Sequence, residues 1–335
     1  MKSLHYYDEP LRVFGVPFFD ETKKLQRLPE DIREKIPALS FLGRRCPGAR
    51  LCFRTDASEF TVKIRFEDMS LDMGMSIYSC QSAFVMVGDR KNPTFAGLVK
   101  PSGYDEKSFE KTIKKEPYME DVIIFLPRNE VIEDIEIAFD DSANIEKPTP
   151  YRDIKPILYY GSSITEGGHA SVPFNAYNSI LSSRLDVDYY NMGFSSSAMG
   201  EIELAEYFCN IDMSVFVYDY DYNAPSVEHL RNTHEAFFSC IREKKPNLPV
   251  IIMSKPAVQY TFDDKERRSV IKDTYNNALM QGDKNVYFID GETFFGDKER
   301  FRCSLDNIHP NDVGMIKMAD TIEPLLKKIL KNIAK

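Results

Sequence analysis

The feature that most constrains the fold is a regular alternation in the second half of the chain, where short apolar runs are separated by longer amphipathic segments. Apolar runs of about 4–8 residues predict buried strands, and the amphipathic segments predict helices. Strands that alternate with helices form a parallel sheet covered by helices on both faces. We expect strands at residues 156–161, 187–193, 214–220, 248–254 and 285–291, and helices near residues 173–185, 200–208, 226–244, 264–280 and 311–331.

The first half follows a different pattern, in which short strands are broken by turns. Residues 61–66 alternate apolar and polar side chains, which is typical of a half-buried antiparallel strand. The pattern predicts an all-β sandwich, with strands at residues 49–55, 59–67, 82–88 and 120–127. Residues 140–155 are polar and contain prolines, as a domain boundary does. We therefore predict a β-sandwich domain over residues 1–148 and an α/β domain over residues 149–335.

Charge and hydropathy exclude several classes of protein. A net charge of -9 would repel a phosphate backbone, so we expect no nucleic-acid partner. No segment has the roughly 18 uninterrupted apolar residues of a transmembrane helix, and the first residues lack the apolar core of a signal peptide. We therefore expect a cytoplasmic protein with no membrane partner, and secretion only if a leader has been removed.

The six cysteines form neither a CxxC pair nor a dense framework. Without a secretion signal, reduced thiols are the favoured interpretation. A bridge between Cys46 and Cys52, across the Pro47-Gly48 turn, is the alternative. The spacing also predicts no structural zinc site.

Four polar stretches follow predicted strands, at the edge of the sheet where ligands of such folds bind. The first is Gly-Ser-Ser-Ile-Thr-Glu-Gly at residues 161–167. A serine in a tight strand-to-helix turn exposes its hydroxyl beside helix amides, which suits attack on a carbonyl. Helix capping is the alternative role for these residues. The Gly-x-Ser-x-Gly elbow is not matched, because Thr165 replaces its second glycine.

The second stretch is Asp-Asn-Ile-His-Pro-Asn at residues 306–311. On a bend, Asp306 can orient the imidazole of His309 and stabilise its charged form, although helix capping is again the alternative. The other histidines lack such a partner. His229 and His234 diverge on a predicted helix and make a poor metal pair, whereas His169 follows two glycines in a position from which it could line the cleft.

The third and fourth stretches are Asn-Met-Gly-Phe-Ser-Ser at residues 191–196 and Asp-Tyr-Asp-Tyr-Asn-Ala-Pro at residues 219–225. Each could direct an amide at the same crevice. Individually they are weak signals, because asparagine and glycine are common in turns.

In this order, the four stretches resemble the conserved blocks of the SGNH (GDSL) hydrolase superfamily, over residues 156–330. The resemblance implies a flavodoxin-like doubly wound sheet and a serine esterase that needs no metal or organic cofactor. It also implies the catalytic residues Ser163, Asp306 and His309. The oxyanion hole would comprise the backbone N–H groups of Ser163 and Ser196 and the side-chain amide of Asn223.

Two residues depart from the family pattern. Ser162 stands where aspartate is usual, and Ser196 stands where the family has its oxyanion glycine. A backbone N–H survives the second change, but a side chain there could narrow the pocket or demand a different backbone conformation.

The first half is similar to the β-sandwich that precedes the catalytic domain in bacterial two-domain esterases of this superfamily. Such sandwiches are jelly-roll-like and resemble carbohydrate-binding modules. Arg44, Arg45 and Arg50 surround the Pro47-Gly48 turn and could reach substrate from this domain. An exposed hairpin with ordinary surface charge is the favoured interpretation of the three arginines.

The expected function is removal of a short acyl group, acetyl from a carbohydrate being favoured, through an acyl-enzyme on Ser163. The expected partner is therefore a small-molecule or carbohydrate ester. One alternative is an acyltransferase that uses the same site. Another is a carbohydrate-binding protein whose catalytic half has decayed, for which Ser196 is the sole support. No phosphate-binding Gly-x-x-x-x-Gly-Lys loop supports a nucleotide-binding role.

Overall fold

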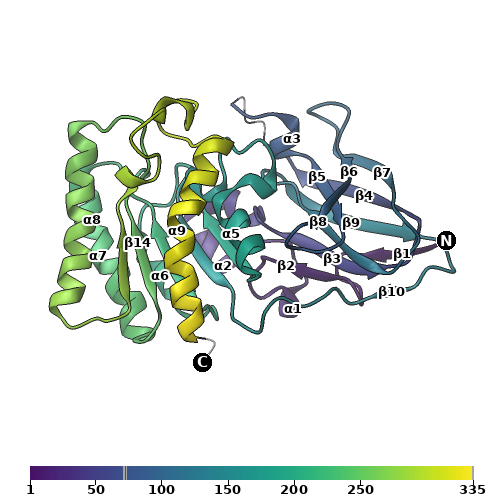
Figure 1. Ribbon diagram of the computed structural model, residues 1–335, viewed down its shortest axis with the longest axis horizontal. Coiled ribbons are helices and arrows are strands. Elements are labelled where there is room, and N and C mark those ends of the chain that lie inside the picture. The colour runs from purple at the N-terminus through teal and green to yellow at the C-terminus, as the bar shows by residue number, and fades with distance from the viewer. Residues whose placement is uncertain (71, 73, 334–335) are drawn as a thin grey trace.

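The computed structural model describes residues 1–70, 72 and 74–333 of the chain. Its first half forms two antiparallel sheets, at the right of Figure 1, and its second half forms a parallel sheet with helices, at the left. One antiparallel sheet has the strand order β1-β9-β4-β7, and the other has the order β10-β3-β8-β5-β6 with β2 beside β3. The strands are β1 (Lys2–His5), β2 (Arg12–Phe14), β3 (Arg50–Thr55), β4 (Glu59–Asp68), β5 (Ala83–Val87), β6 (Thr94–Val99), β7 (Ser108–Lys114), β8 (Glu120–Phe125), β9 (Val131–Phe139) and β10 (Ile145–Glu146).

The two antiparallel sheets pack face to face as a sandwich, because their strands alternate in hydrophobicity. In β4, Val62 and Ile64 are fully buried, whereas the intervening Lys63 is not. Val62 lies opposite Ile137 of β9, and both belong to one apolar core with Leu51 of β3, in the other sheet. The predicted β-sandwich is therefore confirmed, and its four predicted strands correspond to β3, β4, β5 and β8.

The parallel sheet of the second half has the strand order β12-β11-β13-β14-β15, which is the order of a flavodoxin-like doubly wound fold. All five predicted strands form. Their bounds are β11 (Ile157–Gly161), β12 (Tyr189–Gly193), β13 (Val215–Asp219), β14 (Val250–Met253) and β15 (Val286–Ile289).

Helices cover both faces of this sheet. Alternate side chains of β11 point to opposite faces of the sheet. Tyr160 packs in one apolar core with α6, α7 and α8, and Tyr159 packs in a second core with α5 and α9. In Figure 1, α9 runs along the front of the sheet and ends at the C-terminus. The helices are α4 (Ser163–Glu166), α5 (Tyr177–Leu185), α6 (Ile202–Cys209), α7 (Val227–Lys244), α8 (Phe262–Met280) and α9 (Asp312–Ile333).

The N-terminal segment also contributes to the core of the α/β half. Besides the short helices α1 (Phe19–Thr22) and α3 (Ile77–Cys80), the first half forms α2 (Glu30–Lys35), which the sequence analysis did not predict. Ile32 of α2 packs in the same core as Leu204 and Phe208 of α6. The boundary between residues 148 and 149 therefore stays a prediction, because part of the segment before it is packed against the second half.

None of the helices in the described residues is long and apolar enough to cross a membrane. Cys46 and Cys52, both described and buried, are free thiols, as are the other four cysteines. The structure therefore gives no support to the alternative bridge between Cys46 and Cys52.

Close packing of β11, β12 and β13 positions the turn that follows β11. Gly161 lies beside Gly193 and Asp219 in register, so the three strands end at the same level. A Cβ atom on Gly193 would lie 2.1 Å from the backbone nitrogen of Glu166 in that turn. Only glycine allows this approach of two backbone segments.

Gly193→Ala is therefore expected to lower the free energy of unfolding by about 1–3 kcal/mol, because backbone atoms must move to admit the methyl group. Chemical denaturation measures the change. Gly103→Ala serves as a control, since its Cβ would meet only the carboxylate of Asp105, at 3.2 Å. Equal losses in the two variants would contradict the close-packing argument.

Candidate active site

The turn after β11 presents Ser163 at the carboxyl edge of the parallel sheet. Ser163 is the first residue of α4, and the preceding Ser162 caps this short helix by accepting a hydrogen bond from the N–H of Ile164 at 3.2 Å. The alternative capping role thus belongs to Ser162. The N–H of Ser163 lies in the first turn, where helical amides have no acceptor within the helix.

His309 reaches Ser163 from the loop that precedes α9. The Oγ of Ser163 lies 2.8 Å from Nε2 of His309, and Nδ1 of His309 lies 2.7 Å from Oδ2 of Asp306. The loop is braced by Ser304, whose hydroxyl donates to the carbonyl of His309 at 2.9 Å. The structure therefore brings the predicted serine, histidine and aspartate together, although 146 positions separate Ser163 from His309.

Asp306 is held in its ionised form. Partial burial favours the neutral acid, but hydrogen bonds from the backbone N–H and ring of His309 and from the N–H of Ile308 outweigh it and lower the pKa of Asp306 to about 2. A carboxylate in this position orients the imidazole and stabilises the imidazolium that forms when the ring takes a proton. The arrangement is that of a hydroxyl activated for attack on a carbonyl carbon.

The predicted oxyanion residues Ser196 and Asn223 lie on the loops after β12 and β13. Asn223 donates a hydrogen bond from Nδ2 to the carbonyl of Phe194 at 2.8 Å, which ties the two loops together. Ser196 is exposed and has φ of 56°, in the left-handed region that favours glycine. The serine thus keeps a conformation suited to the family's glycine. The oxyanion role of both residues stays a prediction.

This conformation yields a test of Ser196. Ser196→Gly is expected to keep ester hydrolysis near the wild-type rate, because glycine adopts positive φ readily. Ser196→Val is expected to lower kcat by up to about 10²-fold, since a β-branched residue resists this conformation and would redirect a predicted oxyanion donor. Steady-state kinetics on folded variants measures the difference. Equal kcat values for Ser196→Gly and Ser196→Val would contradict the oxyanion role of Ser196.

Glu166 is a further residue of this site, which the sequence analysis missed. Its side chain is buried and accepts hydrogen bonds from the N–H and the hydroxyl of Ser195, at 2.9 and 2.6 Å. Its other carboxylate oxygen pairs with Arg45 from the first half of the chain. Glu166 therefore connects the serine turn, the loop after β12 and the N-terminal half.

The favoured interpretation of the arginines near the Pro47-Gly48 turn is wrong for two of the three. Arg45 and Arg50 are 5% and 1% exposed, and they pair with Glu166 and Asp188 of the second half. Arg44 lies nearer the surface and pairs with Glu67. The turn is an internal contact between the two halves, because Arg45 and Arg50 have partners more than a hundred residues away.

Two further buried arginines surround the same carboxylate. Arg27 donates to the carbonyl of Asn191 at 3.1 Å, and Arg128 donates to the carbonyl of Gly167. Complete burial would raise the pKa of Glu166, but the charges of Arg45, Arg27 and Arg128 outweigh it and keep the pKa below its ordinary value. Nothing in the sequence around these arginines indicates that they are buried. The one local sign of this network is Glu166, a carboxylate inside a serine motif.

Comparison with known proteins agrees with this geometry. The sequence model of the GDSL-like lipase/acylhydrolase family matches residues 154–327, more than half of the chain. The chain belongs to this family. It is accordingly a hydrolase of the esterase or acylhydrolase kind, and its place in the SGNH superfamily is confirmed. No functionally curated protein shows a significant sequence match to the chain.

Solved structures share the fold of this acylhydrolase along its whole length. A GDSL-like lipase from Bacteroides ovatus is 24% identical, with a TM-score of 0.88 and 98% of each chain covered. A salicylyl-acyltransferase from a tetracycline biosynthetic pathway is 18% identical, with a TM-score of 0.80 and coverage of 98% and 97%. An acetyl xylan esterase from the rumen bacterium Butyrivibrio proteoclasticus is 12% identical, with a TM-score of 0.63 and coverage of 99% and 100%.

His169 of the acylhydrolase lies against His309. The ring centroids of His169 and His309 are 4.7 Å apart. Burial and the neighbouring His309 lower the pKa of His169 below its ordinary value. The prediction that His169 could line the cleft agrees with this position. His229 and His234 instead lie on α7, where they bond to the carbonyl of Met199 and the hydroxyl of Thr274.

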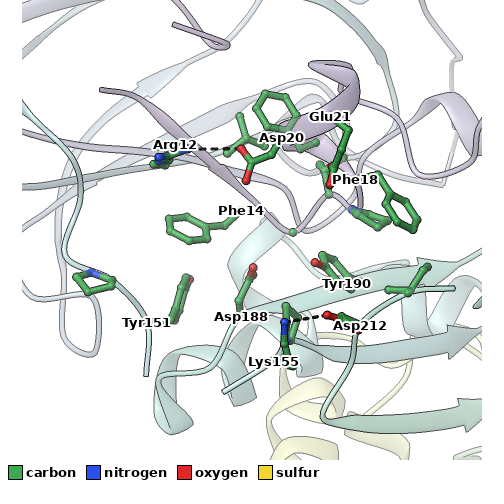
Figure 2. Close-up of a pocket in the computed structure, with 18 of the residues that line it drawn as sticks. Arg12, Phe14, Phe18, Asp20, Glu21, Tyr151, Lys155, Asp188, Tyr190 and Asp212 are labelled. Atoms are coloured by element: carbon green, nitrogen blue, oxygen red, sulfur yellow. Dashed lines mark hydrogen bonds and ion pairs between the residues drawn. The ribbon is translucent and has the colours of Figure 1, made fainter. Parts of the chain in front are cut away.

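A cavity of about 820 Å³ lies elsewhere in the acylhydrolase. Pro156, Asp188 and Asp212, which precede β11, β12 and β13, form one wall, so the cavity lies at the amino ends of the strands. Figure 2 shows Phe14 and Tyr151 facing it, with Asp212 paired to Lys155 at 2.8 Å. Ser163 and His309 lie at the carboxyl ends, so this cavity is not where an ester would meet the serine.

Proposed function

We propose that this acylhydrolase hydrolyses carboxylic esters with short acyl groups through an acyl-enzyme on Ser163. The observation that supports the proposal most strongly is the unbroken hydrogen-bond chain from Ser163 through His309 to Asp306. The same chain argues against a decayed catalytic half, because each member has its partner in place.

Catalysis proceeds in two acyl-transfer steps. His309 takes the proton of the Ser163 hydroxyl as the oxygen bonds to the ester carbonyl carbon, and Asp306 stabilises the resulting imidazolium. The N–H groups of Ser163 and Ser196 and the amide of Asn223 bind the oxyanion, and loss of one such donor costs about 2.7–4 kcal/mol in a well-studied protease. His309 then protonates the leaving alcohol, and water attacks the acyl-enzyme by the reverse sequence.

Acetyl groups on a carbohydrate are the substrate we favour. The fold of the chain matches that of an acetyl xylan esterase over both halves, the sandwich included. A small-molecule or carbohydrate ester is thus the expected partner.

A panel of p-nitrophenyl esters of increasing acyl length, followed by acetylated sugars, tests the proposal. We expect kcat/KM to be highest for acetyl and to fall with chain length, and acetate to be released from acetylated sugars. A preference for long chains would contradict the short-acyl assignment. Absence of turnover on every ester would contradict the esterase itself.

Transfer of the acyl group to another alcohol is the second candidate. It is favoured by the fold match with a salicylyl-acyltransferase, whose TM-score of 0.80 exceeds that of the acetyl xylan esterase. Mass spectrometry of products formed with an acceptor sugar present distinguishes the two reactions. Free acid as the main product supports hydrolysis, and an acylated acceptor supports transfer.

A further inference from the structure

We propose that His169, His309 and Asp306 form an inhibitory binding site for a divalent transition-metal ion such as Zn²⁺. Among the described residues, these three form the one group of at least three histidine, cysteine or acidic side chains whose ligand atoms lie close enough to share an ion. Metal binding depends on their geometry alone. The inhibitory consequence rests on the proposed function, because it requires His309 to be the base.

The donor set and its spacing suit such an ion. One ligand atom from each side chain lies within 4.8 Å of the others. Zinc binds nitrogen and carboxylate oxygen at about 2.0–2.2 Å, so tetrahedral ligands lie about 3.3 Å apart. Side-chain rotation can close the difference, because Asp306 and His309 have side chains 42% and 22% exposed. Two imidazoles and one carboxylate leave a fourth position for water, as in open zinc sites.

The backbone holds His169 at this place. His169 has φ of 63°, an uncommon conformation for a residue other than glycine. The adjacent Gly168 donates its N–H to the carbonyl of Ser163 at 2.7 Å, and the following Ala170 accepts a hydrogen bond from the hydroxyl of Ser79 at 2.8 Å. Both halves of the chain thus fix the loop, and sparsely populated backbone conformations of this kind cluster at functional sites.

The ion would compete with catalysis for His309. A metal on Nε2 takes the lone pair that would accept the proton of Ser163. A metal on Nδ1 displaces the hydrogen bond with Asp306 and leaves the ring proton on Nε2, which then has no lone pair to accept a proton. His169 transfers no proton in the proposed reaction, so its replacement tests metal sensitivity while Ser163, His309 and Asp306 stay in place.

Titration of metal-free enzyme with Zn²⁺ during hydrolysis of p-nitrophenyl acetate tests the inhibition. We expect inhibition that a chelator reverses. His169→Asn is expected to raise the inhibition constant by more than about tenfold, since loss of even an outer-shell partner weakens metal sites about 10–100-fold. Asparagine tolerates the left-handed backbone, so the variant should fold, and its inhibition by Zn²⁺ is compared with its own metal-free kcat/KM. His229→Asn, on α7, is the matched control and should keep full sensitivity to Zn²⁺.

Co²⁺ absorption provides a readout that needs no activity. We expect the inactive Ser163→Ala variant to bind Co²⁺ with visible bands of a low-coordinate N/O site, and His169→Asn to lose them. Unchanged Zn²⁺ inhibition or unchanged Co²⁺ bands in His169→Asn would overturn the proposal, as would wild-type enzyme that binds neither metal at millimolar concentration. A wrong assignment of the function gives another result, because metal-free wild-type protein would then lack esterase activity but would still bind Co²⁺.

Discussion

Replacement of Ser163 with alanine is expected to lower kcat for ester hydrolysis by about 10⁶-fold, the loss found when the serine or histidine of a protease triad is removed. The Oγ of Ser163 is the atom that His309 contacts at 2.8 Å, so its removal leaves the base without a nucleophile. His309→Ala should cost about as much. The double variant should be little worse than either, because the residues act as one unit.

Purified variants assayed side by side, with circular dichroism as a check on folding, test this expectation. Ser183→Ala is a suitable control, because its hydroxyl on α5 donates to the carbonyl of Arg90 and lies outside the hydrogen-bond chain. Esterase turnover that survives Ser163→Ala, or losses that multiply in the double variant, would show that the assignment is wrong.

Arg45→Met and Glu166→Gln are each expected to lower the free energy of unfolding by about 3 kcal/mol or more, because each leaves a buried charge without its partner. Both side chains are nearly inaccessible, at 7% and 2% exposure. Arg27 and Arg128 still face Glu166 when Arg45 is lost, so we expect the lower end of the measured range of about 3–5 kcal/mol. Activity should fall with stability, since Glu166 also anchors Ser195.

A double-mutant cycle isolates this interaction. The double variant Arg45→Met/Glu166→Gln is expected to lose about 2 kcal/mol less free energy of unfolding than the two single variants lose in sum. The reason is that neither position then holds a charge that has lost its partner. Arg54 and Glu146 form the control pair at 2.9 Å, with side chains 34% and 54% exposed. The coupling of this exposed pair should be below about 1 kcal/mol. Equal coupling in the two cycles would contradict the structural role of Glu166.

The parallel sheet and the cluster of Ser163, His309 and Asp306 could be predicted because their signals are local. Each of the five strands is a buried apolar run, and parallel strands place the residues that follow them along one edge. Ser163 and Asn223 therefore had to lie at the same edge, although the chain between them forms the helices α5 and α6 and the strands β12 and β13. The family resemblance assigned their roles, and the hydrogen bond between Ser163 and His309 agrees with it.

The contacts between the two halves could not be predicted, because nothing local marks them. Arg45 and Arg50 stand beside a Pro-Gly turn, where charged residues are ordinarily solvated, and their burial depends on acids more than 100 residues away. The edge strand β1 was missed because its burial is incomplete and its pairing partner is the distant β9. Likewise, α2 is short and gains its stability from the core of the second half.

Fluorophosphonate labelling followed by peptide mass spectrometry shows whether Ser163 is an activated nucleophile, because the reagent reacts with a serine only where a base activates it. We expect one adduct per chain, on the peptide that contains Ser163, absent in Ser163→Ala and formed far more slowly in His309→Ala. An adduct on another residue, or folded wild-type protein that stays unlabelled, would contradict this expectation.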